Sequence, residues 1–572
     1  MTHGLRKALT NYGDEGFSLF LRKAFIKALG YSDDAIDRRI VGITNTASDF
    51  NPCHGNVPAL IEAVKRGVML SGALPMVFPT ISIHESFAHP TSMFLRNLMA
   101  MDTEEMIRAL PVDAIVLIGG CDKTLPAQIM GATSADRPTI VLPVGPMLVG
   151  HFKGEVLGAC TDCRRFWSEF RGGRMSEEDI TLANERLVPS IGTCGVMGTA
   201  STMACIVEAL GLSLPGSASI PATHADRVRC AEATGRRAAV MTNGGPRPSE
   251  ILTVKAFRNA MVVLQAIGGS TNAVVHLSAI AGRTQHAVSL DDYDAVGRAT
   301  PVLVDLKPTG THYMEHFHQA GGVPRLMQEI KDLLALDAAH VVGGTLGDAI
   351  KTYEDVSGQT VIRRRGAPLK KEGGIAILRG NLCPRGAVIK QGAASPKLMQ
   401  HEGRAVVFDS LADMATRIDD PDLDVDESDI LVLRNAGPVG APGMPEAGYL
   451  PIPKKLAQKG VKDMVRISDA RMSGTAFGTI VLHIAPEAAA GGPLALARSG
   501  DRIRIDVPAR RLDLLIDEAE LERRRMEWRK PDSAQARRGY AWLYREHVQQ
   551  ADQGCDFDFL AAFPGGTQGR PD

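Results

Sequence analysis

Three cysteines in glycine-rich or turn-like phrases are the residues of this chain best suited to chemistry: Cys53 in NPCHGN, Cys121 in GGCDKT and Cys194 in GTCGVMGTAST. Long intervening segments rule out a local zinc knuckle, so only the fold could bring the three thiols together. Neighbouring glycines let backbone N–H groups approach a sulfur, an arrangement that suits an iron–sulfur cluster. The alternative is three buried cysteines that act as small apolar side chains.

A second group of residues could hold a hard cation. Carboxylate oxygens are ligands that Mg²⁺ prefers, and three candidates stand in loop-like phrases, namely Glu85, Asp122 and Glu446. Lys123, directly after Asp122, belongs to the same candidate group. Ser473, in DARMSGTAFG, lies in a glycine-flanked turn that can present its hydroxyl. Taken one at a time, the charged residues are equally compatible with solvated loops and the serine with a structural turn.

Composition excludes several classes of protein. The 572 residues carry 64 Lys plus Arg and 65 Asp plus Glu, a net charge of −1, which argues against nucleic-acid binding through bulk charge. Nine irregularly spaced cysteines do not resemble a secreted disulfide framework. The first residues lack the apolar core of a signal peptide, and no uncharged apolar run reaches the ~18 residues that a membrane span requires. We therefore expect a cytoplasmic protein with free thiols and no membrane or nucleic-acid partner.

The N-terminal part alternates short β-rich runs with helical stretches. Strands are predicted at 39–45, 74–80, 113–120 and 137–145, with helices at 56–70 and 92–110 among them. Continuous apolar strands between helices indicate a parallel sheet covered on both faces, whose ligands lie at the carboxyl ends of the strands. Candidate residues such as Cys53 and Cys121 follow the carboxyl ends of these predicted strands.

The pattern changes near residue 373, where short strands separated by loops begin, followed by charged helical sequence at 515–530. The predicted strands of this part are GGIAILRG, RAVVFDS, DILVLRN, DMVRISD, GTIVLHI and DRIRIDV. We predict an α/β protein with an N-terminal α/β/α domain, 1–372, and a C-terminal mostly-β, barrel-like domain, 373–572. The proline- and glycine-rich stretch 435–453 is too long for a simple turn, and loops of this kind are often functional.

Taken together, these phrases closely resemble the iron–sulfur dihydroxy-acid and sugar-acid dehydratases. The matching phrases occur in the family's order: SDFNPCHGN, FPTISIHESF, GGCDKTLPAQ, GTCGVMGTASTM, IGGSTNAVVHL, GNLCPRGAVIK, GMPE and SDARMSGTAFG. The ending RGYAWLYREHVQQADQGCDFDFL also resembles the sugar-acid branch, so the likeness covers nearly the whole chain.

The resemblance implies roles for the residues above. Cys53, Cys121 and Cys194 would ligate a 2Fe–2S cluster, or alternatively a 4Fe–4S cluster, with one iron left open as a Lewis acid. Mg²⁺ would be held by Glu85, Asp122, Glu446 and a carbamylated Lys123. Ser473 would be the base. The family also implies a homodimer or homotetramer.

These roles imply dehydration of a sugar acid to a 2-keto-3-deoxy acid. Ser473 would remove the proton at carbon 2, Mg²⁺ would bind the carboxylate and 2-hydroxyl, and iron would assist loss of the 3-hydroxyl. The wording around His54 and after Glu85 resembles pentonate dehydratases and favours an aldonate such as L-arabinonate or D-xylonate. Candidate partners for the polyol are His54, His84, Ser201 and Thr202, each of which could instead be a loop or cap residue.

Two other functions remain open at this stage. One is a dihydroxy-acid dehydratase of branched-chain amino-acid biosynthesis. The other is a non-catalytic iron–sulfur sensor, which would use the cysteines but would not need the carboxylates and Ser473. Cys160 and Cys163 form a CTDC pair that superficially matches a redox CxxC motif. Because a thioredoxin-like context is missing, we interpret these two, like the other four remaining cysteines, as bystanders.

Overall fold

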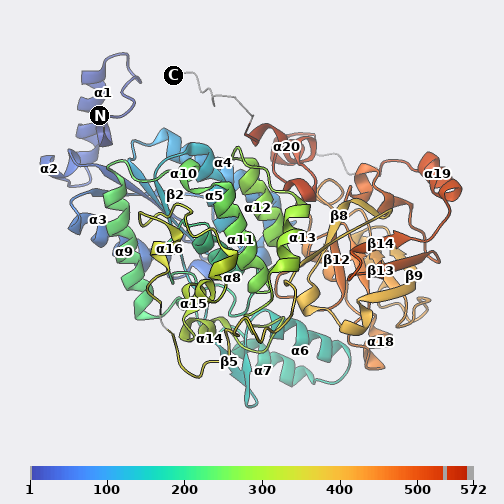
Figure 1. The fold of residues 1–572 in the computed structure, drawn as a ribbon. Coiled ribbons are helices and arrows are strands. Elements are labelled where there is room, and N and C mark those ends of the chain that lie inside the picture. Colours follow the sequence, from blue (N-terminus) through green and yellow to red (C-terminus); the bar gives the residue numbers. More distant parts are fainter. Residues whose placement is uncertain (1–2, 354, 532–536, 563–572) are drawn as a thin grey trace.

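The chain folds into a layered α/β part followed by a barrel (Figure 1). The structure is a computed structural model, and it describes residues 3–353, 355–531 and 537–562. The last ten residues of the predicted second domain lie outside this range. The first part, in blue to yellow-green, packs beside the barrel, in orange to red.

The sheet of the first part is parallel, as predicted. Its strand order is β2-β1-β3-β4, and it consists of β1 (Ile40–Asn45), β2 (Leu74–Pro79), β3 (Ala114–Gly119) and β4 (Thr139–Pro143). Every residue of β3 and β4 is buried. Because these strands are buried on both faces, they are apolar without alternation, which is the pattern by which the sequence revealed them.

Helices cover the sheet and extend into a large helical layer. Those that flank or follow the strands are α3 (Val57–Leu70), α4 (Arg96–Ala109), α5 (Thr124–Ala135), α8 (Thr199–Ala209), α9 (Ala225–Met241), α11 (Val254–Ala266) and α12 (Asn272–Gly282). α8 and α12 are almost completely buried, and they join the same apolar core as the sheet. The N-terminus of α8 therefore holds the preceding Cys194 loop rigidly against the core.

The second part is a closed eight-stranded barrel, in the order β10-β11-β12-β8-β7-β14-β13-β9. Its strands are β7 (Ala376–Gly380), β8 (Cys383–Ile389), β9 (Gln400–Phe408), β10 (Ile430–Leu433), β11 (Arg466–Ser468), β12 (Ile480–Ala485), β13 (Arg502–Asp506) and β14 (Arg511–Leu514). A separate apolar core fills it. The loops after β10 and β11 carry Glu446 and Ser473.

The predicted fold class is confirmed, while some elements were missed. β8 and β14 were not among the predicted strands, because β8 contains Pro384 and Gly386 and β14 has only four residues. The predicted helix at 515–530 is shorter, at α19 (Glu518–Glu527). Among the described residues, no helix combines the length and apolar character needed to cross a bilayer. The boundary between 372 and 373 stays a prediction.

A glycine contact fixes the distance between α3 and α9. A methyl group on Gly67 would overlap the backbone carbonyl oxygen of Glu232, and one on Gly235 would overlap that of Val64. The two helices therefore meet backbone to backbone, which only glycine permits.

We expect Gly67→Ala to lower the thermal unfolding midpoint, because the helices must separate at an overpacking cost of about 1–3 kcal/mol. Gly282→Ala is the matched control, since a methyl group there meets no neighbour within 4 Å. Differential scanning calorimetry of both variants is the measurement. Equal midpoints for the two would contradict this account of the helix contact.

Candidate active site

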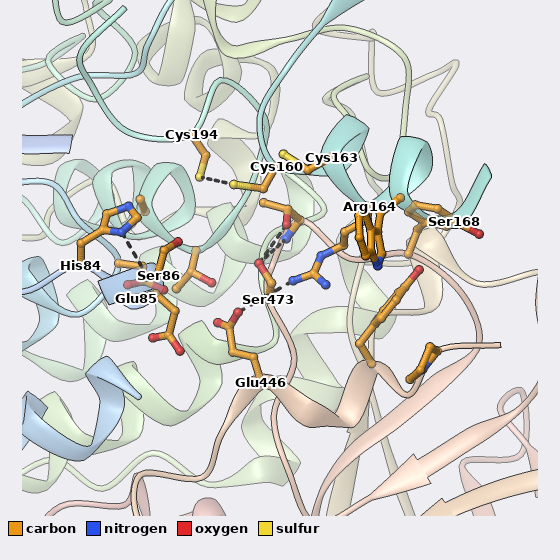
Figure 2. A pocket seen from close by; sticks show the side chains of 18 of the residues that line it. His84, Glu85, Ser86, Cys160, Cys163, Arg164, Ser168, Cys194, Glu446 and Ser473 are labelled. Atoms are coloured by element: carbon orange, nitrogen blue, oxygen red, sulfur yellow. Dashed lines mark hydrogen bonds and ion pairs between the residues drawn. The ribbon is translucent and has the colours of Figure 1, made fainter. Parts of the chain in front are cut away.

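A cavity of about 630 Å³ lies between the two parts of the chain, lined by residues from both (Figure 2). The first part contributes the turns after the sheet strands, together with α6 (Thr161–Arg171). The barrel contributes the loops that carry Glu446, Tyr449 and Ser473. The carboxyl ends of parallel strands are where such sheets bind ligands, so the cavity lies where the topology predicts.

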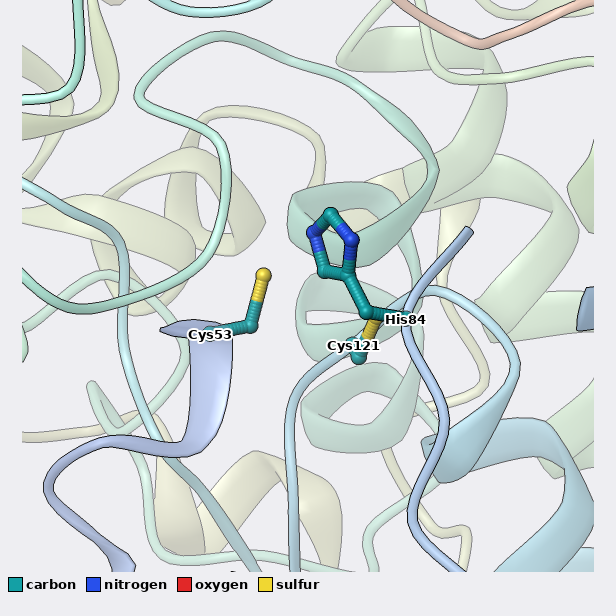
Figure 3. Close-up of side chains that lie close together, drawn as sticks. All are labelled: Cys53, His84 and Cys121. Atoms are coloured by element: carbon teal, nitrogen blue, oxygen red, sulfur yellow. The ribbon is translucent and has the colours of Figure 1, made fainter. Parts of the chain in front are cut away.

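Cys53 and Cys121 lie together at the inner end of this cavity. Cys53 is in a short 3-10 turn after β1, and Cys121 follows β3. Their sulfurs and a ring nitrogen of His84 lie within 4.8 Å of one another (Figure 3). The pKa of the Cys53 thiol is lowered to about 6, chiefly because Cys121 donates a hydrogen bond to its sulfur. Thiolates are the ligands of iron, so this pair suits a cluster.

Cys194 lines the same cavity, and it has a neighbour that the sequence did not indicate. Its sulfur lies 3.6 Å from the sulfur of Cys160, and Cys163 lines the cavity beside them (Figure 2). We interpreted Cys160 and Cys163 as bystanders, but the structure places both in the lining of the cavity. The sequence separation of 34 between Cys160 and Cys194 hid this contact, because only the placement of α6 creates it.

His54 contacts the backbone beside Cys121 and does not line the cavity. It is fully buried and is not among the lining residues. Its Nδ1 donates to the carbonyl of Thr46 at 2.9 Å, while Nε2 accepts from the backbone N–H groups of Gly120, at 3.0 Å, and Cys121, at 2.9 Å. Burial lowers the pKa of His54 to about 4, so the ring is neutral and can accept both bonds. We correct its predicted substrate role to positioning of the Cys121 turn.

Ser201 and Thr202 also face protein rather than the cavity. Both are buried in α8: Ser201 donates to the carbonyl of Cys194 at 3.1 Å, and Thr202 accepts from the N–H of Ser270 at 3.0 Å. Neither lines the cavity, so the structure offers them no substrate contact. His84 does line it, and its role toward substrate stays a prediction.

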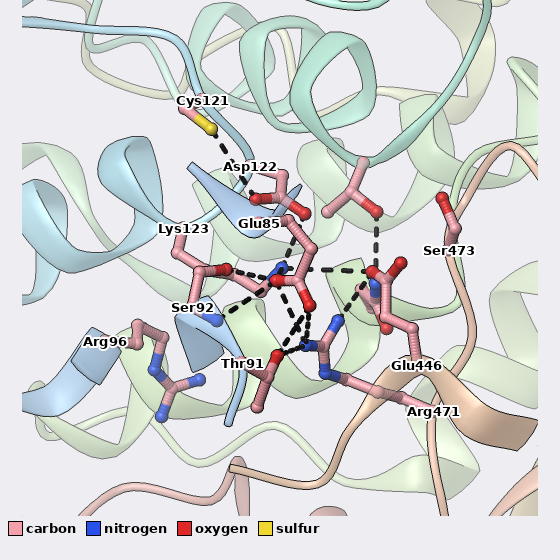
Figure 4. Close-up of polar contacts among 12 residues, drawn as sticks. Glu85, Thr91, Ser92, Arg96, Cys121, Asp122, Lys123, Glu446, Arg471 and Ser473 are labelled. Carbon is pink, nitrogen blue, oxygen red and sulfur yellow. Dashed lines mark hydrogen bonds and ion pairs between the residues drawn. The ribbon is translucent and has the colours of Figure 1, made fainter. Parts of the chain in front are cut away.

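Three carboxylates converge next to the cysteines. Oxygens of Glu85, Asp122 and Glu446 lie within 4.8 Å of one another (Figure 4). The Lys123 ammonium lies among them, 2.5 Å from Asp122, 3.4 Å from Glu85 and 4.0 Å from Glu446. Such a compact set of oxygen ligands fits a divalent cation. In the structure, the Lys123 ammonium provides the positive charge among the three carboxylates.

A second buried cation, Arg471, was missed from the sequence. It contacts Glu446 at 2.7 Å and Glu85 at 3.4 Å, and it donates to the hydroxyl of Thr91 at 2.7 Å (Figure 4). Burial opposes ionisation of Glu85, but Lys123 and Arg471 hold the pKa of that carboxyl well below its usual value. Burial dominates at Glu446 and raises its pKa.

Ser473 lies in a turn whose backbone is held from several sides. Its hydroxyl is 2.8 Å from that of Thr475, and the N–H of Thr475 lies at 3.4 Å. Lys390, another residue missed from the sequence, is fully buried and donates to the carbonyl of Gly474 at 2.9 Å. Burial lowers the pKa of Lys390 to about 7. The feature of the sequence that could have indicated Lys390 is its place directly after the apolar run GAVI.

The cavity combines paired thiols, a carboxylate cluster and a serine. This is the site of an enzyme of the dehydratase class, and comparison with known proteins identifies the family. Residues 38–349 match the N-terminal model and residues 360–555 the C-terminal model of the dihydroxy-acid/6-phosphogluconate dehydratases. The chain belongs to this family and is a hydro-lyase.

Curated relatives align over almost the whole length. A protein named putative dehydratase IlvD1 from Rhizobium meliloti is 48% identical over 97% of this chain and 96% of its own. An L-arabinonate dehydratase from Rhizobium leguminosarum is 47% identical over 98% and 97%, and a 6-deoxy-6-sulfo-D-gluconate dehydratase from Pseudomonas putida is 45% identical over 93% and 92%. Several relatives named dihydroxy-acid dehydratase are less similar, at 36–38%.

We expect His54→Ala to reduce the iron and sulfide bound per chain. The substitution leaves two buried N–H groups of the Cys121 turn without an acceptor, at about 1–3 kcal/mol each, and loosens that turn. The exposed His151→Ala is the control. Circular dichroism checks that both variants are folded, and a full iron content in folded His54→Ala would contradict the positioning role.

Proposed function

We propose that this enzyme dehydrates an aldonic acid, such as L-arabinonate or D-xylonate, to the corresponding 2-keto-3-deoxy acid. The observation that carries the proposal is a group of polar side chains on α6 in the cavity wall. Arg164, Ser168 and Arg171 line the space together with apolar residues, and Tyr449 of the barrel part lines it as well. A polyol tail needs hydrogen-bonding partners of this kind, whereas an alkyl tail does not.

Arg164 is the strongest of these partners. Its guanidinium lies over the ring of Tyr449, 4.9 Å from the centroid, and 3.9 Å from Glu446, and its Nε is buried without a hydrogen-bond partner (Figure 2). Arg171, by contrast, is already paired with Asp419 at 2.5 and 2.7 Å. A guanidinium in the cavity wall favours a ligand that supplies an oxygen, and this argues against the branched-chain dihydroxy acid, whose tail carries only methyl groups.

The residues present fit the cofactors that the resemblance implies. Cys53, Cys121 and Cys194 would hold a 2Fe–2S cluster, with a 4Fe–4S cluster as the alternative. Glu85, Asp122, Glu446 and Lys123 as its carbamate would hold Mg²⁺, since a free ammonium among three carboxylates competes with a cation. When bound, the two groups supply Lewis acidity toward the carboxylate and hydroxyl oxygens of the substrate.

The chain's own groups then account for the proton transfer. Deprotonated Ser473 removes the proton at carbon 2, and both the hydroxyl and the N–H of Thr475 stabilise its charged oxygen. The bond from carbon 3 to its hydroxyl breaks, and that oxygen leaves as water with the proton that Ser473 had taken. The resulting enol tautomerises to the keto acid. No redox partner is needed, because no electrons are gained or lost overall.

We also propose a cytoplasmic homodimer or homotetramer with a small sugar acid as its substrate. The near-zero net charge supports the absence of a nucleic-acid partner. Sedimentation velocity of the holoenzyme is the direct measure of the assembly.

A substrate panel tests the proposed function. We expect kcat/KM on at least one C5 or C6 aldonate to exceed that on 2,3-dihydroxyisovalerate by at least about 100-fold, because the alkyl tail offers no oxygen to the Arg164 guanidinium. The assay follows keto-acid formation by anaerobically purified enzyme. Preference for 2,3-dihydroxyisovalerate would reject the sugar-acid proposal.

The serine can be tested separately. We expect Ser473→Ala to lower kcat by about 10²–10⁴-fold, the usual contribution of a positioned base, with iron content and electron paramagnetic resonance spectrum unchanged. Thr181→Ala, which removes an exposed hydroxyl on α7 (Glu177–Arg186), is the control. Full activity of Ser473→Ala would exclude Ser473 as the base.

A further inference from the structure

The cavity contains a second pair of cysteines that the proposed mechanism does not use. Cys160 is the residue before the first turn of α6, and Cys163 lies within that turn. Both line the cavity, and Figure 2 shows Cys160 directed toward Cys194, with a separation of 3.6 Å between the two sulfurs. This is within the range of a sulfur–sulfur hydrogen bond.

The position of Cys160 is fixed from both sides. The hydroxyl of Thr161 donates to the carbonyl of Thr475 at 2.9 Å, which ties the start of α6 to the serine turn. On the other side, Asp162 accepts from the N–H of Gly158 at 2.9 Å and pairs with Lys307 at 3.0 Å. These contacts hold the Cys160 backbone, so its sulfur is placed against Cys194 by the fold.

A thiol in this position has a defined effect on an iron–sulfur site. Hydrogen bonds to a ligating sulfur withdraw electron density from it and are among the factors that set the reduction potential of a cluster. A carboxylate or a water molecule could exert a similar effect. Here the nearest group to the sulfur of Cys194 that the described hydrogen bonds record is the thiol of Cys160.

We propose that Cys160 is a positioning residue of the iron–sulfur site, whose thiol donates a hydrogen bond to the sulfur of Cys194. The inference rests on the proposed function in one respect, that Cys194 ligates the cluster. The contact itself allows either sulfur to donate. A Cys194 that ligates iron is a thiolate and can only accept, so Cys160 is the donor, keeps its own proton and forms no bond to iron. Its contribution is to stabilise the electron-rich Cys194 thiolate, which raises the reduction potential of the cluster and makes its iron a better acceptor for an oxygen ligand.

The test is the reduction potential of anaerobically purified holoenzyme, measured by redox titration with electron paramagnetic resonance detection. We expect Cys160→Ala to retain the iron and sulfide of the wild type and to shift the potential to more negative values. Cys160→Ser keeps a donor at the same place, so its potential should return toward that of the wild type. Cys163→Ala is the matched control, because it removes the neighbouring thiol in α6 and leaves the Cys160–Cys194 contact in place.

Each contrary result has a separate meaning. An unchanged potential and spectrum in Cys160→Ala would overturn the hydrogen-bond role. Loss of iron from both Cys160→Ala and Cys160→Ser would also overturn it, because that result would make Cys160 a ligand of the cluster. Full cluster content in Cys194→Ala would instead refute the assignment of Cys194, and with it part of the proposed function, without reference to Cys160.

Discussion

Neutralisation of three half-buried carboxylates is the constraint on which the site depends. Glu85 and Asp122 come from the α/β part and Glu446 from the barrel, and their oxygens meet within 4.8 Å. Buried like charges are costly unless opposite charges accompany them. In the structure the compensating cations also come from both parts, Lys123 from the first and Arg471 from the second. With Lys123 as its carbamate, as proposed, Mg²⁺ would supply the positive charge in place of the ammonium. The acidic cluster is therefore stable only when the two parts are joined.

The other contacts across the cavity follow from that junction. Arg471 reaches Thr91 of the first part, and Arg171 of α6 pairs with Asp419 of the second. Arg171 and Asp419 both line the cavity, so their ion pair joins the two parts across it. Arg471 and Thr91 join the two parts outside the lining.

The sequence predicted the parts of the site that depend on strand ends, and it failed where side-chain direction decides. Cys53 and Cys121 follow parallel strands, whose carboxyl ends share one edge of the sheet, so their proximity could be expected. His54 was assigned to substrate as a candidate partner for a polyol, but the 3-10 turn directs its ring to the backbone of Cys121. Arg164 and Cys160 could not be predicted, since the placement of α6 follows from long-range packing and not from local pattern.

The serine turn illustrates how a reactive group is oriented by contacts to its neighbours. Lys390 from the barrel binds the carbonyl of Gly474, and Thr161 from α6 binds that of Thr475. A methyl group on Gly474 would overlap Ser270 and the N–H of Thr199, so the turn lies directly against the start of α8. Three elements thus fix the backbone directly after Ser473 while its hydroxyl faces the cavity. A base gains rate from correct placement, and this arrangement supplies placement without burying the hydroxyl.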